Sequence, residues 1–251
     1  RRGFLVNKLF ALILAWAMLA ALVSCGTSTG NTSGTETGSL NETASQEGHS
    51  EATPPNEAVP PASSDTDVLI AYFSRVGNTD FSEDVDAVSS ASLLRKDGEL
   101  YGNTQYIATL IQQATGGNLF LIETEEKYPA DYDETDQLGG KENRERSRPA
   151  LASHVDDIAG YDRIYLGYPN WYYDMPMAVY AFLEEYDLSG KTIIPFVTSG
   201  GSGFSKSISE IQSLQPNAEV LTEGYKVTHS KVNDVTLEDI EQWLDSLEIS
   251  G

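Results

Sequence analysis

The twelve residues VLIAYFSRVGNT, numbered 68–79, join an apolar run to a short polar loop. Residues 68–73 are apolar without alternation, which is typical of a strand that is buried on both faces in a parallel sheet. The loop at 74–79 offers hydroxyl groups and the backbone N–H groups that glycine leaves accessible, and such donors bind phosphate. We therefore predict a first strand that ends at a phosphate-binding loop.

After this loop, short apolar runs alternate with helical patterns to the end of the chain. Further strands are predicted at 119–122, 164–168 and 193–197, with a weaker fifth strand at 220–221. Apolar residues recur at helical spacing within 107–114, 179–186, 204–214 and 237–247. Parallel strands need a crossover helix between them, so the pattern predicts an α/β fold with helices on both faces of a five-stranded parallel sheet.

Three segments fit this pattern poorly. Pro195 lies inside the fourth strand and removes a donor from the ladder, so we expect a local irregularity there. Residues 131–150 are rich in Asp, Glu and Arg and contain two adjacent glycines, which indicates at most a broken, exposed helix. Residues 80–102 form a polar insertion with a turn at 96–99, and this insertion delays the helix expected directly after the first loop.

A second Gly-Asn-Thr, at residues 102–104, precedes the delayed helix. Asn103 or Thr104 is favoured as the N-cap of that helix, because short polar side chains satisfy free N–H groups at a helix start. Contact of these two residues with a phosphate is the alternative. Both roles are compatible if the insertion loops out and returns to the first loop.

Two more loops follow predicted strands. The aromatic cluster YPNWYYDMP, at 168–176, suits a flat heteroaromatic ring. The segment TSGGSGF, at 198–204, contains glycines that allow a backbone to approach a ligand and to donate N–H groups to ring carbonyls. Aromatic residues under a lid and glycines in a flexible turn would explain either loop alone. Ligands of open α/β sheets bind beyond the carboxyl ends of the strands, and all three loops are predicted there.

The first loop resembles the flavodoxin phosphate loop, Ser/Thr-x-Thr-Gly-Asn-Thr, with Val76 in place of a hydroxyl residue. The other two loops resemble those of a bacterial branch of the flavodoxin-like family, so the resemblance covers essentially all of residues 68–251. It implies a three-layer sandwich with strand order 2-1-3-4-5. It also implies non-covalent FMN, with the phosphate on the first loop and the isoalloxazine between the second and third loops.

The resemblance assigns a set of residues to FMN. Trp171 and Tyr172 are expected to stack on the ring, and the backbones of Pro169, Asn170, Gly200 and Gly201 to contact its edge. The complete predicted set is Ser74, Arg75, Val76, Gly77, Asn78, Thr79, Asn103, Thr104, Pro169, Asn170, Trp171, Tyr172, Tyr173, Ser199, Gly200, Gly201, Ser202 and Gly203.

Three functions remain open for such a protein. It is an electron carrier between protein partners, an NAD(P)H-dependent reductase of quinones or similar small molecules, or a non-redox module that binds a phosphate ligand. The sequence shows no evident nucleophile, triad or metal cluster, and surface roles are favoured for His49, His154 and His229. The net charge of −22 argues against nucleic acid as a partner and is compatible with a low flavin potential.

The N-terminal residues predict export and a membrane tether. Arg1, Arg2 and Lys8 precede an apolar run at 9–23, which describes a secretory signal. The residues LVSC at 22–25 resemble a bacterial lipobox, in which Cys25 is acylated; a plain membrane anchor with an incidental cysteine is the alternative.

The opening RRGFL resembles the twin-arginine signature, so export is expected by the twin-arginine or the general secretory route. Residues 26–66 hold almost no bulky apolar side chains and cannot bury enough surface to fold. We therefore predict a signal at 1–25, a disordered linker at 26–66 and a domain at 67–251, anchored by lipid to the outer face of the cell membrane.

Overall fold

A computed structural model describes residues 66–83, 85 and 92–247 of the chain. The predicted signal, the lipobox with Cys25 and all but the last residue of the predicted linker lie outside these described residues. Within the described part, no helix has both the length and the apolar character needed to cross a membrane.

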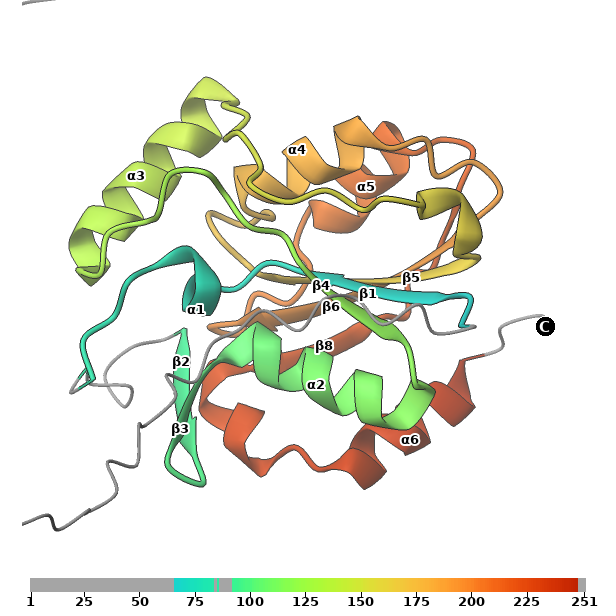
Figure 1. The fold of residues 1–251 in the computed structure, drawn as a ribbon, viewed down its shortest axis with the longest axis horizontal. Helices are drawn as coiled ribbons and strands as arrows, with labels where there is room; N and C mark the ends of the chain where they lie inside the picture. Colours follow the sequence, from blue (N-terminus) through green and yellow to red (C-terminus); the bar gives the residue numbers. More distant parts are fainter. Residues whose placement is uncertain (1–65, 84, 86–91, 248–251) are drawn as a thin grey trace, which may run out of the picture. The chain divides into compact units, whose positions relative to one another are not determined.

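A parallel sheet forms the centre of the domain (Figure 1). Its order is β4 (Asn118–Leu121), β1 (Val68–Tyr72), β5 (Arg163–Pro169) and β6 (Thr192–Ser199), followed by β7 (Glu219–Val220) and β8 (Tyr225–Thr228), which both pair with β6. Every pairing in this sheet is parallel. The predicted α/β class and the order 2-1-3-4-5 are confirmed.

Helices cover both faces of the sheet (Figure 1). On one face lie α2 (Asn103–Thr115) and α6 (Leu237–Ser246); on the other lie α4 (Met177–Glu185) and α5 (Ser207–Leu214), with α3 (Tyr132–Glu145) on the same side toward the carboxyl ends of the strands. The short helix α1 (Arg75–Asn78) follows β1 at this edge, and 3-10 turns η1 (Ile158–Gly160) and η2 (His229–Asp234) lie in connections.

The apolar run of β1 supplies two separate cores. Leu69 and Ala71 belong to the core under α4 and α5, whereas Val68 and Ile70 belong to the core under α2 and α6. Alternate side chains of a strand point to opposite faces, so a strand covered on both sides has no polar face. The uninterrupted apolar pattern is therefore explained by the three-layer architecture, in which both faces of β1 are covered.

β6 is continuous through Pro195, but the strand next to it in the sheet is interrupted at this position. β7 pairs with residues up to Ile193, and β8 resumes pairing at Phe196. At Gly224, between these two strands, a Cβ atom would lie 2.0 Å from the Pro195 carbonyl oxygen. The expected irregularity thus falls on the fifth strand, which is split into two pieces, of which the sequence predicted only the first.

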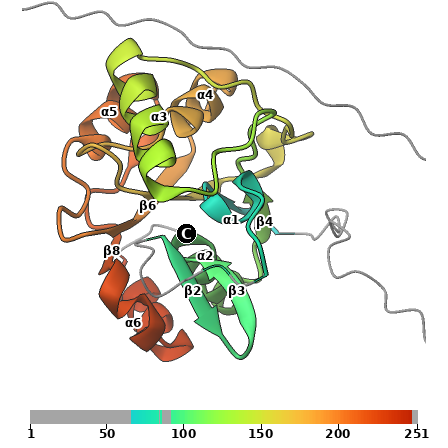
Figure 2. The same ribbon diagram turned by 90° about the vertical axis from the view of Figure 1, so that its left-hand side faces the viewer.

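The insertion contains a β-hairpin that the sequence analysis missed. β2 (Leu93–Lys96) and β3 (Glu99–Gly102) pair in antiparallel fashion around the predicted turn, where Asp97 and Gly98 have φ of 54° and 87°. Two successive positive φ values are typical of two-residue hairpin turns, and an Asp-Gly pair is favoured there. In both views the hairpin lies on the side of the sheet opposite to α3 (Figures 1 and 2).

Candidate functional site

The three predicted loops meet in one pocket at the carboxyl edge of the sheet. The pocket has a volume of about 290 Å³, and its wall includes Arg75 from the first loop, Pro169, Asn170, Trp171 and Tyr172 from the second, and Thr198, Ser199 and Gly200 from the third. The backbone N–H of Asn170 donates to the Thr198 carbonyl at 2.8 Å, which joins the second loop to the third. Parallel strands thus bring together segments that are far apart in the sequence.

Asn78 holds the first loop in shape. Its Nδ2 donates to the carbonyl oxygens of Ser74 and Ile122 at 2.9 and 3.0 Å, and its Oδ1 accepts from the backbone N–H and the hydroxyl of Thr124 at 2.8 and 3.0 Å. These four bonds use the full capacity of an amide side chain. The predicted ligand contact of Asn78 is therefore limited to its backbone.

Three buried donors of the first loop have no hydrogen-bond partner among the described residues: Ser74 Oγ, Arg75 Nε and Thr79 Oγ1. Each such group costs about 1–3 kcal/mol when it stays unpaired. The other end of Arg75 is fixed, because its Nη2 donates to the carbonyls of Pro129 and Ala130 at 2.8 and 3.0 Å. Burial lowers the pKa of the Arg75 guanidinium, yet arginine remains charged in proteins. The loop therefore presents one cation and two hydroxyls suited to an anion.

The second Gly-Asn-Thr returns to the first loop. A Cβ atom at Gly102 would lie 1.9 Å from Ser74 Oγ, so only glycine allows this approach. Gly102 is also the N-cap of α2, and its N–H donates to the Gln105 side chain at 3.1 Å. The prediction that Asn103 or Thr104 caps this helix is wrong. The Thr104 hydroxyl lies 2.9 Å from that of Thr198 and ties α2 to the third loop.

Helix α3 forms a wall of the pocket that the sequence analysis missed, through Tyr132, Thr135, Asp136 and Gly139. The predicted broken helix is wrong, because α3 is continuous over 14 residues and Asp131 caps it by accepting from Glu134 N at 2.9 Å.

Two glycines of α3 explain its close approach to the second loop. A Cβ atom at Gly139 would lie 3.1 Å from the Trp171 ring, and one at Gly140 would lie 2.6 Å from the Tyr172 hydroxyl. Tyr172 also donates to the Asp136 carbonyl at 2.6 Å. The two adjacent glycines were the feature of the sequence that could have indicated this wall. Glycines in a helix allow another segment to pack closely against it, and they do not always interrupt the helix.

The remaining predicted residues surround the pocket without lining it. Tyr173 is 72% exposed and lies outside the wall. In the third loop the N–H groups of Gly201 and Gly203 donate to Ser199 Oγ at 3.2 and 3.1 Å, and the Gly203 carbonyl accepts from Asn170 at 2.8 Å. The N–H of Gly201, expected to meet a ligand, therefore has a partner within the loop. Also outside the wall are Ser74, Val76, Gly77, Asn78, Thr79, Asn103, Thr104 and Ser202.

A family model described as flavodoxin matches residues 94–247. The chain belongs to the flavodoxin family. The match begins in the insertion hairpin and includes the second Gly-Asn-Thr and the loops after β5 and β6. A search of curated proteins gives no match.

Two solved structures with TM-scores above 0.5 show the same fold. A protein from Bacteroides uniformis ATCC 8492, classed as a flavoprotein, is 28% identical with a TM-score of 0.54, over 72% of this chain and 99% of that one. A second, from Bacteroides eggerthii DSM 20697, is 26% identical with a TM-score of 0.54, over 73% of this chain and 98% of that one. A flavoprotein from Lactobacillus acidophilus NCFM in complex with FMN is 19% identical with a TM-score of 0.43, over 66% of this chain and 96% of that one.

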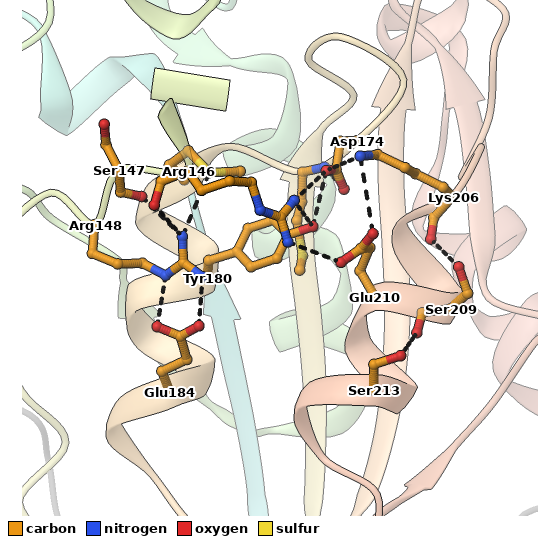
Figure 3. Close-up of polar contacts among 12 residues, drawn as sticks. Arg146, Ser147, Arg148, Asp174, Tyr180, Glu184, Lys206, Ser209, Glu210 and Ser213 are labelled. Atoms are coloured by element: carbon orange, nitrogen blue, oxygen red, sulfur yellow. Dashed lines mark hydrogen bonds and ion pairs between the residues drawn. The ribbon is translucent and has the colours of Figure 1, made fainter. Parts of the chain in front are cut away.

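In this flavodoxin-family chain, a buried carboxylate anchors the second loop (Figure 3). Asp174 is fully buried, and its Oδ2 lies 3.0 Å from Lys206 Nζ and 3.9 Å from Arg146 Nη1 and accepts from the Tyr180 hydroxyl at 2.9 Å. Its Oδ1 accepts from the backbone N–H of Met175 at 2.9 Å. Burial and the bonded carboxylate raise the pKa of Tyr180, which keeps this hydroxyl a donor. The loop is thereby fixed to α4, α5 and the end of α3.

The turn that carries the two tyrosines is strained. Trp171 and Asp174 exchange backbone hydrogen bonds at 2.8 and 3.0 Å, and between them Tyr172 and Tyr173 have φ of 55° and 61°. Turns of this kind favour Asn-Gly, because residues with a Cβ atom resist positive φ. The chain thus holds two aromatic residues in an unfavourable backbone conformation, one of them in the pocket wall.

Replacing Tyr173 with glycine is expected to raise the free energy of unfolding by about 1 kcal/mol, because the strain at this position disappears and the lost side chain is mostly exposed. Urea denaturation measures the change. The control is Tyr173→Ala, which removes the ring and keeps the Cβ atom. An equal gain in both variants would show that the ring, and not the backbone, carries the cost.

Glu142, on α3, is expected to make the stability of the protein depend on pH. Its Oε2 accepts from the Tyr128 hydroxyl at 3.0 Å, and the Tyr128 ring packs against Trp171 with centroids 5.4 Å apart. Burial raises the pKa of Glu142 above its ordinary 4.5, and the Tyr128 hydrogen bond offsets part of the rise. A raised folded-state pKa means that the folded protein binds more protons than the unfolded one, so stability falls as pH rises from about 4.5 through the folded-state pKa.

Glu142→Gln is expected to remove this loss, giving a variant that is more stable than the parent at neutral pH and less dependent on pH above 4.5. Thermal unfolding across pH 4–8 measures it. Glu184→Gln is the control of opposite sign, because the hydrogen bond from Arg148 lowers the pKa of Glu184 and its contribution is lost only as pH falls. Parallel curves for Glu142→Gln and the parent would contradict the assignment.

Two further wall residues were not anticipated, Ser92 and His229. Ser92 directly precedes the insertion hairpin, and its carbonyl accepts from the Asn103 N–H at 2.9 Å. His229 begins η2, just after β8. Among the described residues, no group of three His, Cys, Asp or Glu side chains is placed to hold a metal ion.

Proposed function

We propose that this chain binds FMN non-covalently in the pocket at the carboxyl edge and acts as a redox protein. The observation that carries the proposal is the set of unpaired buried donors on Ser74, Arg75 and Thr79, in a loop whose Arg75 lines a pocket with an aromatic wall. When bound, the flavin supplies one- and two-electron chemistry, and the protein supplies orientation and electrostatics.

The first loop fits the phosphate end of FMN. Two hydroxyls and a charged guanidinium would satisfy phosphate oxygens and would themselves gain the partners that they lack. Gly102 places the first turn of α2 against Ser74, so the positive end of a 13-residue helix dipole adds to the attraction. A neutral ligand would leave these donors unused, which disfavours a role without a phosphate group.

The second and third loops fit the ring end. Trp171 and Tyr172 supply an aromatic wall that is backed by α3, and the glycine-containing loop after β6 lines the same pocket. Aromatic rings pair with a flat heteroaromatic ring through offset or edge contacts. The network on Asp174 keeps this wall in place without entering the pocket.

We further propose that the domain transfers electrons at the outer face of the cytoplasmic membrane, to which lipid on Cys25 would tether it. Its partner is a redox protein or a small-molecule acceptor, and nucleic acid is disfavoured by the net charge of −22. This part rests on the N-terminal sequence pattern and on charge alone. Mass spectrometry of the membrane-extracted protein tests it, since an unmodified Cys25 in that fraction would contradict the tether.

Reconstitution with FMN tests the redox proposal. The purified full chain, treated with FMN and desalted, is expected to retain one flavin and to show a shifted visible spectrum that bleaches with dithionite. NADPH added to the same sample separates two modes of action: rapid bleaching followed by quinone turnover identifies a reductase that uses NADPH, and a stable spectrum identifies a carrier that is reduced by another donor. Absence of retained flavin would refute both.

A further inference from the structure

Three aromatic rings form a closed cluster next to the pocket. The Trp171 ring centroid lies 5.4 Å from those of Phe73 and Tyr128, and the latter two centroids are 5.6 Å apart. All three pairs meet at interplanar angles of 79–85°, an edge-to-face geometry that aromatic pairs favour. Trp171 belongs to the pocket lining, whereas Phe73 and Tyr128 do not and are buried in the core. The cluster therefore leads from the pocket into the protein.

The Tyr128 hydroxyl is bonded to a base. It donates to Glu142 Oε2 at 3.0 Å, and an ionised carboxylate can only accept. This distance is within the reach that proton transfer needs. Burial, and after it the nearby charge of Glu142, raises the pKa of Tyr128, so the phenol keeps its proton at neutral pH. Tyr128 thus holds a proton beside a group that can receive it.

Other tyrosines lack one of these two features. Tyr172 donates to a backbone carbonyl at 2.6 Å, which is a much weaker base than a carboxylate. Tyr180 donates to a buried carboxylate at 2.9 Å, but the guanidinium of Arg146 lies 4.8 Å from its ring centroid. A cation at this distance makes removal of an electron from the ring costly. Among the described residues, no recorded ring contact joins Tyr180 to Trp171.

We propose that Trp171, Tyr128 and Glu142 form a chain that carries an oxidising equivalent out of the pocket. The proposal rests on the proposed FMN site, because flavin excited by visible light is the one-electron oxidant. One electron passes from Trp171 to the oxidant and one from Tyr128 to Trp171, while the Tyr128 hydroxyl proton moves to Glu142 Oε2. Trp171 is then restored, Tyr128 is a neutral radical and Glu142 is a neutral acid. Return of the electron reverses these transfers.

The chain moves the oxidised position away from the flavin site. Tyr128 and Glu142 both line a second cavity of about 350 Å³, and neither belongs to the lining of the first pocket. Phe73 completes the ring cluster but has no group that is readily oxidised. Trp171, which the proposed flavin site uses as its aromatic wall, is therefore oxidised only briefly, and the chain protects that wall in light.

The test uses the full chain loaded with FMN and illuminated at neutral pH. Pentaamminechlorocobalt(III) is added to remove the electron from the flavin, and samples frozen during illumination are measured by electron paramagnetic resonance. The parent is expected to show a tyrosyl radical, and Tyr128→Phe a tryptophan radical in its place. Glu142→Gln keeps the phenol but removes the base, so its tyrosyl signal should fall at least about tenfold.

Tyr168→Phe is the matched control. Tyr168 is buried in the same core as Tyr128, but its hydroxyl lies 2.8 Å from the Ser207 hydroxyl and not from a carboxylate. Its radical signal should equal that of the parent. FMN retention is measured in every variant before illumination. Tyr128→Phe and Glu142→Gln each remove one partner of the same hydrogen bond, so either variant decides if the other fails to fold.

The results separate the chain from the flavin site. If the parent retains no FMN, the proposed function fails and the chain loses its oxidant. If FMN is retained and illumination gives no tyrosyl radical, or an equal one in Tyr128→Phe, the proposal alone is overturned. An equal tyrosyl signal in Glu142→Gln and the parent would also overturn it, because the proton would leave without the carboxylate. Loss of FMN in both variants would make the pair part of the flavin site and would contradict the chain.

Discussion

Thr79→Val is expected to weaken FMN binding by about 1.5–3 kcal/mol, a factor of roughly ten to one hundred and fifty in Kd, without destabilising the free protein. The Thr79 hydroxyl is buried and has no partner in the described structure, so valine, which has the same shape, removes a donor that the free protein does not use. Isothermal titration with FMN and urea denaturation of the free protein measure the two effects separately.

Thr109→Val is the matched control for this result. Its hydroxyl already has a partner, because it donates to the Tyr106 carbonyl at 2.7 Å within α2, so FMN affinity should equal that of the parent. An unchanged affinity in Thr79→Val would move the phosphate toward the second Gly-Asn-Thr, and Thr104→Val would then be the variant to lose FMN. Weakening in neither variant would leave the phosphate without a threonine contact.

Asp174→Ala is expected to lower the free energy of unfolding by about 2–4 kcal/mol. The change leaves the buried Tyr180 hydroxyl without its acceptor and releases Lys206 and Met175 N–H from the same carboxylate (Figure 3). The partly exposed cations regain water, which keeps the loss below that of a fully buried ion pair. Urea denaturation at neutral pH measures the change, and FMN affinity should fall with it as the second loop loosens.

Glu210→Ala is the control that distinguishes the buried carboxylate of Asp174 from the partly exposed charges around it. Glu210 pairs with Arg146 at 3.2 Å and with Lys206 at 3.9 Å but is partly exposed, so its removal should cost less than about 1 kcal/mol. Equal losses for the two variants would mean that the network acts through surface charge. A loss confined to Asp174→Ala supports the buried carboxylate as the residue that fixes the aromatic wall.

The sheet could be predicted because its strands are covered on both sides. An uninterrupted apolar run such as 68–73 has few alternatives once crossover helices follow it, and strand order then agrees with the family resemblance. The split fifth strand was harder, because Pro195 acts on its neighbour through space and its effect appears at Gly224. No pattern within residues 221–228 reports that contact.

The site was predicted in part, for a different physical reason. Loops that leave parallel strands must converge, so the positions of Arg75, Trp171 and Gly200 follow from topology. The α3 wall could not be derived from hydrophobic periodicity, since its contact with Trp171 and Tyr172 is made by glycines that have no side chain. His229 was assigned a surface role because nothing in its own segment indicates that η2 lies beside the pocket.

Side-by-side titration of the full chain with FMN and with riboflavin tests the central claim most directly. The two ligands share the ring and differ in the phosphate, which the donors on Ser74, Arg75 and Thr79 are proposed to hold. We expect one FMN to bind per chain and riboflavin to bind at least about a hundredfold more weakly, as two charged hydrogen bonds would require. Equal affinities, or no binding of either, would contradict the account.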